Sequence, residues 1–161
     1  MEYLDSLFSL KDQVAVVTGG TGVLGGAMAR GLARAGARVA VLGRRREQAE
    51  ATAAAINAAG GEALALPADV LARSQLEAAC ATLLTTWGRV DILVNAAGGN
   101  LPAATLPPGQ SFFNLPVEGM EPVIALNLQG TLLPSQVFGA EMARCGRAAS
   151  STSRRWRRSG R

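Results

Sequence analysis

The sequence predicts an α/β fold in which helices cover both faces of a parallel, doubly wound sheet. Three observations lead to this fold class. The 161 residues are 48% hydrophobic and 17% charged, which suits a single globular domain with a sizeable core. Four short apolar runs alternate with segments of helical length, and glycines stand at several of the junctions. Such alternation is typical of right-handed crossovers between parallel strands.

The four apolar runs are expected to be strands buried on both faces, because they are short and rich in valine, alanine and leucine. They are residues 14–18, 38–42, 63–66 and 91–95. The segments between them are rich in alanine or carry apolar side chains at helical spacing, which predicts helices. These helices are residues 25–35, 47–59 and 74–87.

The regular alternation ends after Asn95. Residues 98–116 are rich in proline and glycine and are expected to form a loop. Residues 118–144 are expected to form one long helix that Pro134 kinks. No fifth strand is expected, so residues 91–95 should form an open, aggregation-prone edge.

The residue inventory excludes several kinds of chemistry. Histidine is absent, so no histidine-based triad and no metal site is expected. The two cysteines, Cys80 and Cys145, cannot frame a disulfide-rich fold. Neither a leader peptide nor a membrane span is recognisable. We therefore expect a soluble, cytoplasmic protein without a membrane partner.

The net charge of +4 comes from the end of the chain. Residues 147–161 hold six arginines and no acid, whereas residues 1–146 hold ten basic and twelve acidic residues. A basic tail can bind nucleic acid or simply be solvated. Because the remaining residues show no basic face, we expect no nucleic-acid partner. Salt-dependent binding that disappears with the tail would favour the alternative, a nucleic-acid binder.

A glycine-rich turn joins the first expected strand to the first expected helix. Gly20, Gly22 and Gly25 form a G-x-G-x-x-G pattern. Glycines allow a tight turn and let backbone N–H groups approach a pyrophosphate at the positive end of the helix. In this strand–turn–helix context the pattern predicts a dinucleotide site, and a purely structural turn is the alternative.

The end of the second expected strand bears on the choice of dinucleotide. NAD sites place an acid there for the ribose hydroxyls, whereas this chain has Gly43 followed by three arginines, 44–46. A guanidinium at Arg44 suits the additional phosphate of NADP. The sequence therefore predicts NADP, with NAD as the alternative; the arginines could also be a solvated helix start. Replacing Gly43 by Asp and Arg44 by Ala is expected to reverse the preference.

Three motifs together resemble the short-chain dehydrogenase/reductase family over residues 8–146. They are the glycine turn, Asp69-Val70 after the third expected strand, and Asn95-Ala96-Ala97-Gly98 after the fourth. Val23 departs from the pattern, because the main subfamily has a glycine there. The resemblance implies a Rossmann-like NAD(P)-binding domain over residues 1–146, incomplete and limited to strands one to four with their helices. It also implies a small carbonyl or alcohol substrate and a homo-oligomeric parent protein.

The resemblance implies roles for individual residues. Asp69 and Val70 would flank the adenine, and Asn95 with Ala97 would support the nicotinamide ribose. The cofactor-binding candidates are Gly19, Thr21, Gly22, Leu24, Gly25, Arg44, Asp69, Val70, Asn95 and Ala97. The catalytic candidate is Asn127, which resembles the family asparagine that holds a water in a proton relay; the alternative is a helix asparagine bonded to nearby backbone. Residues 97–100 and 130–138 are similar to the mannonate/fructuronate, or sugar-acid, oxidoreductase branch.

The other catalytic residues of the family are missing. Its chemistry uses a tyrosine as general acid/base and a lysine four residues later, while the nicotinamide carries the hydride. The only tyrosine and lysine, Tyr3 and Lys11, precede the glycine turn and cannot be that pair. We therefore expect an inactive N-terminal fragment of an NADP-preferring oxidoreductase. The alternative is a natural, non-catalytic dinucleotide-binding module.

Residues 148–161 are interpreted as an out-of-frame, disordered continuation. A coding sequence can be chosen for a family-like strand and turn that, read after the loss of one G, yields these residues and then a stop codon. The hypothesis predicts a downstream Y-x-x-x-K in the neighbouring frame. A native tail rich in arginine and serine is the alternative.

Overall fold

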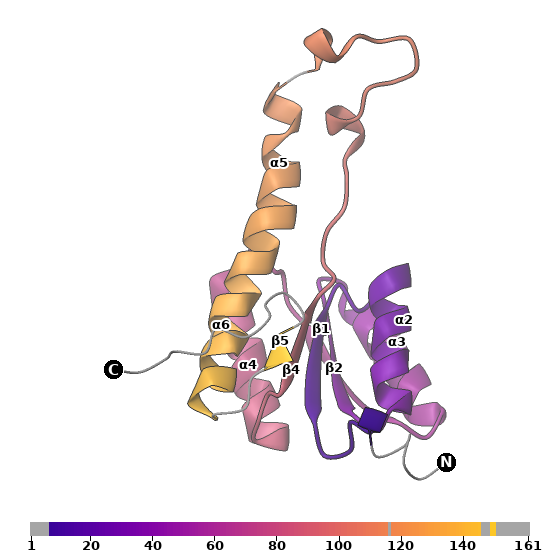
Figure 1. The fold of residues 1–161 in the computed structure, drawn as a ribbon, viewed down its shortest axis with the longest axis vertical. Helices are drawn as coiled ribbons and strands as arrows, with labels where there is room; N and C mark the ends of the chain where they lie inside the picture. Colours follow the sequence, from indigo (N-terminus) through magenta and orange to yellow (C-terminus); the bar gives the residue numbers. More distant parts are fainter. Residues whose placement is uncertain (1–6, 116, 146–148, 151–161) are drawn as a thin grey trace.

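A parallel sheet forms the centre of the structure, a computed structural model that describes residues 7–115, 117–145 and 149–150. Its strands are β1 (Val14–Thr18), β2 (Arg38–Gly43), β3 (Glu62–Pro67), β4 (Ile92–Asn95) and β5 (Ala149–Ser150), in the order β3-β2-β1-β4-β5. Helices α2 (Val23–Arg34) and α3 (Arg46–Ala58) cover one face, and α4 (Arg73–Trp87) and α6 (Gly130–Arg144) cover the other (Figure 1). The predicted doubly wound parallel sheet is confirmed.

The central strand β1 shows why its apolar run was recognisable. All five of its residues are buried. Val14 and Val16 pack into the core on the side of α4 and α6, while Ala15 and Val17 pack into the core on the side of α2 and α3. A strand covered on both faces needs apolar side chains at every position rather than at alternate ones.

A buried carboxylate joins the beginnings of β1 and β4. Asp91, which immediately precedes β4, accepts a hydrogen bond from the backbone N–H of Val14 at 2.9 Å. The guanidinium of Arg89 donates to the same carboxylate, with 2.7 Å between Nε and Oδ2. In return, the N–H of Asp91 donates to the carbonyl of Val14 at 2.9 Å. This reciprocal pair holds the two strands together at their amino ends.

The expectation that no fifth strand follows is wrong. Residues 149–150 form β5, which pairs in parallel with Ile92 and Leu93 of β4. β5 therefore pairs with half of the edge that was predicted to be open. Among the described residues this pairing ends at Leu93. The sequence did not reveal β5 because alanine and serine lack the branched and aromatic side chains typical of strands. The remainder of the tail, residues 151–161, lies outside the described residues.

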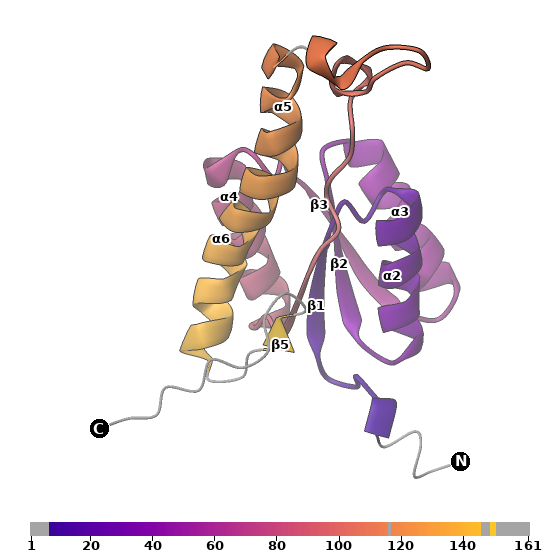
Figure 2. The same cartoon turned by 45° about the horizontal axis from the view of Figure 1, so that its top comes forward.

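The expected long helix is present but changes its hydrogen-bonding pattern. It comprises α5 (Glu121–Ile124), a π-helical turn (Ala125–Gln129) and α6, which form one column in both views (Figures 1 and 2). The chain remains helical through Pro134, which is buried inside α6. The preceding loop contains short 3₁₀ turns and rises beyond the carboxyl end of the sheet toward the top of α5 (Figure 2). None of the described helices is long and apolar enough to cross a membrane.

The two cysteines should differ strongly in reactivity. The side chain of Cys80 in α4 is 5% exposed, and burial, together with the negative charge of Glu141, raises the pKa of its thiol to about 11. Cys145 is exposed after the end of α6. Because only the thiolate is nucleophilic, a disulfide reagent at pH 8 is expected to modify Cys145 in the folded chain and Cys80 only after unfolding. Thiol counting with and without denaturant measures this.

The variant Cys145→Ser is the matched control. A thiol that still reacts rapidly in the folded state of this variant would contradict the prediction.

Burial also links Cys80 to the pH dependence of stability. The folded state favours the neutral thiol, so this contribution is present below the ordinary pKa of 9.0 and is lost as the pH rises toward 11.

Candidate functional site

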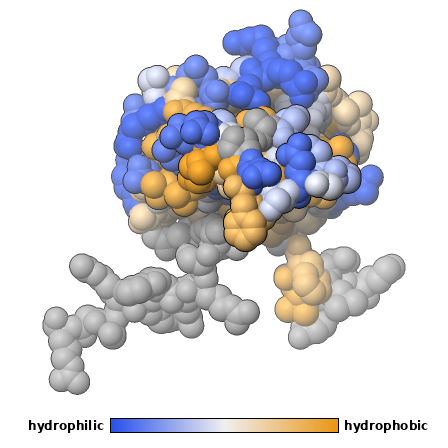
Figure 3. All heavy atoms as spheres, turned by 90° about the horizontal axis from the view of Figure 1, so that it is seen from above, coloured by the Kyte–Doolittle hydropathy of each residue, from blue (hydrophilic) through white to orange (hydrophobic). Residues whose placement is uncertain are grey.

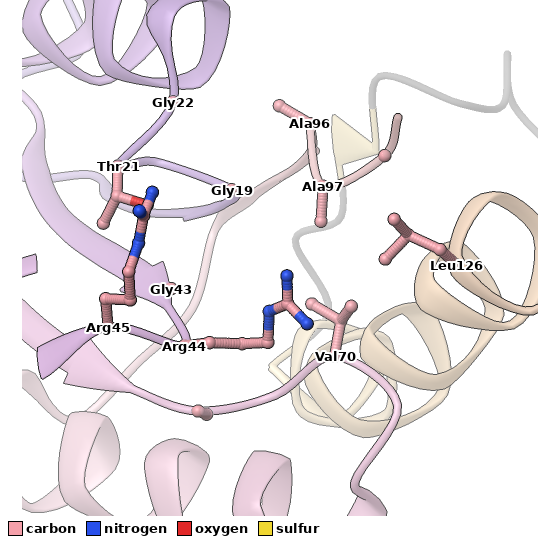
Figure 4. Close-up of a pocket in the computed structure, with 12 residues that line it drawn as sticks. Gly19, Thr21, Gly22, Gly43, Arg44, Arg45, Val70, Ala96, Ala97 and Leu126 are labelled. Carbon is pink, nitrogen blue, oxygen red and sulfur yellow. The ribbon is translucent and has the colours of Figure 1, made fainter. Parts of the chain in front are cut away.

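A cavity of about 580 Å³ lies at the carboxyl end of the sheet, where the turns after neighbouring strands converge (Figure 4). It is lined by the glycine turn after β1, residues 43–45 at the end of β2, Ala68 and Val70 after β3, residues 96–98 after β4, and Leu126. The order of the strands reverses at β1, which pairs with β2 on one side and β4 on the other. Ligands of doubly wound sheets bind at such a switch point.

Two glycines are required by the tight turn after β1. Gly19 has a φ of +63°, and a Cβ there would lie 2.7 Å from the carbonyl oxygen of Ala96 and 2.8 Å from the Cα of Ala97. A Cβ on Gly25 would collide with the carbonyl of Gly19. The turn can therefore pack against both α2 and the segment after β4 only without these side chains.

The buried side chain of Thr18 fixes the turn after β1 against the turn after β4. Its Oγ1 accepts hydrogen bonds from the backbone N–H groups of Ala96 and Ala97, each at 3.1 Å, and donates to the carbonyl of Val94 at 3.5 Å. Thr18 was missing from the predicted site residues. Its position at the end of β1, directly before Gly19, was the available signal, but its hydrogen-bond partners are distant in the chain.

Two arginines extend along the rim of the cavity. The side chain of Arg44 reaches across it toward Val70, while that of Arg45 lies beside Thr21 (Figure 4). The third arginine, Arg46, forms an ion pair with Glu50 at 3.5 Å. Within the described part of the chain neither Arg44 nor Arg45 forms an ion pair, and no acidic residue lines the cavity. The cavity therefore offers positive charge to an anionic ligand; the contribution of Arg45 was not predicted.

The structure brings six of the ten predicted cofactor-binding residues to the lining of this cavity. They are Gly19, Thr21, Gly22, Arg44, Val70 and Ala97. Gly25 supports the turn from behind. Asp69 instead organises the turn after β3, since its carboxylate accepts a hydrogen bond from the N–H of Leu71 at 2.9 Å.

Leu24 and Asn95 are also outside the lining. Leu24 is 73% exposed on the first turn of α2. The face of the molecule seen from above carries apolar side chains among polar ones (Figure 3). Asn95 donates from Nδ2 to Oγ of Ser135 at 3.0 Å, and its buried Oδ1 has no hydrogen-bond partner among the described residues. Asn95 thus connects β4 to α6 beneath the cavity.

Asn127 ties the π-helical turn to the segment after β4. Its Nδ2 donates to the carbonyls of Gly99 at 2.7 Å and Val123 at 2.8 Å, and its Oδ1 accepts from the N–H of Gly99 at 3.2 Å. A Cβ on Gly98 would lie 2.8 Å from that Oδ1. These contacts match the interpretation of a helix asparagine bonded to backbone, and the proton-relay role stays a prediction.

The described residues place no acid–base pair of the tyrosine–lysine kind at the cavity. Lys11 is exposed and precedes β1, so it lies at the opposite end of that strand from the cavity. Tyr3 lies outside the described residues. Among the described residues no group of three histidine, cysteine, aspartate or glutamate side chains could hold a metal ion.

Comparisons with known proteins identify relatives in sequence and in fold. A family model for short chain dehydrogenases matches residues 13–152. The uncharacterized oxidoreductase UxuB of Bacillus subtilis is 46% identical over 142 residues, covering 83% of this chain and 51% of that protein. D-threitol dehydrogenase of Mycolicibacterium smegmatis is 35% identical over 146 residues, covering 91% and 54%. The chain therefore spans about half the length of the curated relatives it matches.

Two solved structures are similar and contain a nicotinamide dinucleotide. A protein from Haemophilus influenza, named as a D-mannonate oxidoreductase with bound NAD, superposes with a TM-score of 0.77 at 35% identity and covers 86% of this chain and 53% of that one. A metagenomic short-chain oxidoreductase in complex with NADP gives a TM-score of 0.74 at 33% identity, covering 88% and 61%.

Proposed function

This chain belongs to the short-chain dehydrogenase family, and from that membership we propose that its cavity is an NADP site. The observation that carries the proposal is the pair of arginines, Arg44 and Arg45, which line the cavity without an ion-pair partner in the described chain. A guanidinium forms charge-assisted, bidentate hydrogen bonds with phosphate. An acid at Gly43, which would accept from the ribose hydroxyls of NAD, is absent.

The glycine turn would hold the pyrophosphate of the cofactor. Helix α2 begins after Gly22, which offers no side-chain cap, and its first turn contains no acidic residue. The first N–H groups of a helix need acceptors, and the helix dipole favours an anion at this end. Val70 would lie against the adenine, and Ala97 on the nicotinamide side, as the family resemblance implies.

For the whole protein we propose oxidoreduction of a carbonyl or secondary alcohol, with a sugar acid as the substrate class. The similarity to the D-mannonate oxidoreductase supports this class. The nicotinamide would supply or accept the hydride, while residues of this chain bind and orient the cofactor. Asn127 would position the segment after β4 at the cavity and, in the family role, hold a water. This chain is proposed to bind cofactor without turnover, since no tyrosine–lysine pair lies at the cavity among the residues that the structure describes.

A natural, non-catalytic dinucleotide-binding module is the second candidate function. The binding residues that support it are those of the first, because Gly19, Thr21 and Arg44 line the cavity whether or not chemistry follows. The gene sequence beyond codon 147 separates the two. A coherent Y-x-x-x-K in a neighbouring frame supports the disrupted enzyme, and its absence supports the module.

Replacing Arg44 by Ala is expected to weaken NADPH binding about tenfold to a hundredfold and to leave NADH binding nearly unchanged. The reason is the loss of a charge-assisted hydrogen bond, worth about 1.5–3 kcal/mol, to a phosphate that only NADPH carries. Calorimetric titration of the chain with both nucleotides measures the effect. Arg46→Ala is the matched control, because Arg46 is paired with Glu50 and lies outside the cavity lining. Equal affinities of the unsubstituted chain for NADPH and NADH would contradict the proposal.

A further inference from the structure

Gly43, the last residue of β2, is a glycine for reasons other than backbone conformation. It is buried, it pairs with Pro67 of β3, and its φ is not among the positive values of the chain. Its backbone would therefore accept any L residue. The atoms that surround position 43 therefore decide whether a side chain can be accommodated there.

The side chain of Thr21 occupies the space beside Gly43. A Cβ on Gly43 would lie 2.7 Å from Cγ2, 2.9 Å from Oγ1 and 3.4 Å from Cβ of Thr21. Both residues line the same cavity, with Thr21 in the glycine turn above the end of β2 (Figure 4). Two heavy atoms of a single branched side chain thus block the position.

Rotation of the threonine cannot clear this space. A staggered side chain has three sites on Cβ, and in Thr21 the two that face Gly43 are filled by Cγ2 and Oγ1. Turning χ1 by 120° moves only one of these two atoms away from Gly43. The other atom then occupies one of the two sites that face Gly43. Serine has one heavy atom beyond Cβ and therefore has a rotamer that leaves both sites open.

We propose that Thr21 is a specificity-determining residue, because its branched side chain excludes from position 43 the acidic side chain that would bind the ribose hydroxyls of NAD. This inference rests on the proposed NADP site and adds a second determinant to Arg44. Selectivity then has a repulsive part as well as an attractive one. Conversion of the site toward NAD then requires a smaller residue at position 21 in addition to a change at Gly43. The double replacement of Gly43 by Asp and Arg44 by Ala, which the sequence suggested would reverse the preference, is therefore not expected to do so while Thr21 is present.

The test combines Gly43→Asp with three side chains at position 21: threonine, serine and valine. Thr21→Val is the matched control, since valine keeps the branched shape and lacks the hydroxyl. We expect Gly43→Asp to lower the denaturant midpoint of the chain with threonine or valine at position 21, and to lower it much less with serine. We expect NADH to bind about tenfold to a hundredfold more tightly to Thr21→Ser/Gly43→Asp than to Thr21→Ser alone. No such gain is expected with threonine or valine.

The outcomes separate this inference from the proposed function. If Gly43→Asp improves NADH binding as much with threonine as with serine, or lowers the midpoint equally in all three backgrounds, Thr21 does not exclude the acid and only this inference is overturned. If neither the unsubstituted chain nor any variant binds either nucleotide, the proposed NADP site is wrong and the inference fails with it. A gain confined to the serine background supports both.

Discussion

Replacing Gly25 by Ala is expected to weaken NADPH binding roughly a hundredfold or more and to lower the free energy of unfolding by about 1–3 kcal/mol. The added Cβ would collide with the carbonyl oxygen of Gly19 and would lie 2.7 Å from its carbonyl carbon and 3.1 Å from the backbone N of Gly20. All of these are backbone atoms, which cannot rotate away. The turn must therefore shift and carry its N–H groups away from the pyrophosphate.

A second glycine of α2 provides the matched control. A Cβ on Gly31 would have nothing within 4 Å, and Gly31 lies in the interior of the helix. Gly31→Ala is therefore expected to stabilise the chain by about 0.5–1 kcal/mol, because alanine loses less backbone entropy in a helix. Denaturant unfolding and nucleotide titration of both variants measure the contrast. If Gly25→Ala behaved like Gly31→Ala, the close approach of the turn to α2 would be wrong.

Replacing Asp91 by Ala is expected to lower the free energy of unfolding by about 2–3 kcal/mol. Asp91 is 6% exposed, and its carboxylate accepts from the N–H of Val14 and from the guanidinium of Arg89. Without it, the buried N–H of Val14 loses its acceptor at the beginning of the central strand. Denaturant unfolding measures the loss.

Asp91→Asn separates the two functions of the carboxylate. Its amide oxygen can still accept from the N–H of Val14, so this variant is expected to lose less stability than Asp91→Ala. Arg89→Ala, which leaves the bond to Val14 intact, is also expected to lose less. If the alanine and asparagine variants were equally stable, the bond to Val14 would contribute little to the folded state.

The order of strands and helices was predictable because it follows from neighbouring residues. The predicted range of β1, residues 14–18, agrees with the structure at both ends, and β2 extends only to Gly43 beyond its predicted end. Both strands are buried on two faces, so their runs are continuously apolar and end at glycines. The ends of the first three helices differ from their predicted positions by at most two residues, as at α2, which begins at Val23, whereas α5 begins three residues after the predicted start. Apolar spacing did not reveal the first turn of α2, because glycines mark this part of the sequence.

The candidate site was predictable in location and only partly in composition. Strands that run in parallel bring the turns after them to one edge, so the glycine turn, Arg44, Val70 and Ala97 could be expected to meet. The sequence did not indicate that Arg45 would lie beside Thr21, nor that Asp69 would bond to the turn after β3. Which side of a turn faces the cavity depends on backbone angles that single residues do not fix.

By itself, the sequence determined the fold class, the central strands and the glycine turn, because each depends on the burial or backbone freedom of residues close together in the chain. Only the tertiary structure decided that β5 pairs with β4, that Asn127 bonds to Gly99, and that Thr21 blocks Gly43. Each of these is a contact between segments distant in the chain. Such contacts depend on how closely the sheet and its helices pack. In a close-packed interior, a difference of a few tenths of an ångström or a single methyl group determines whether a side chain fits.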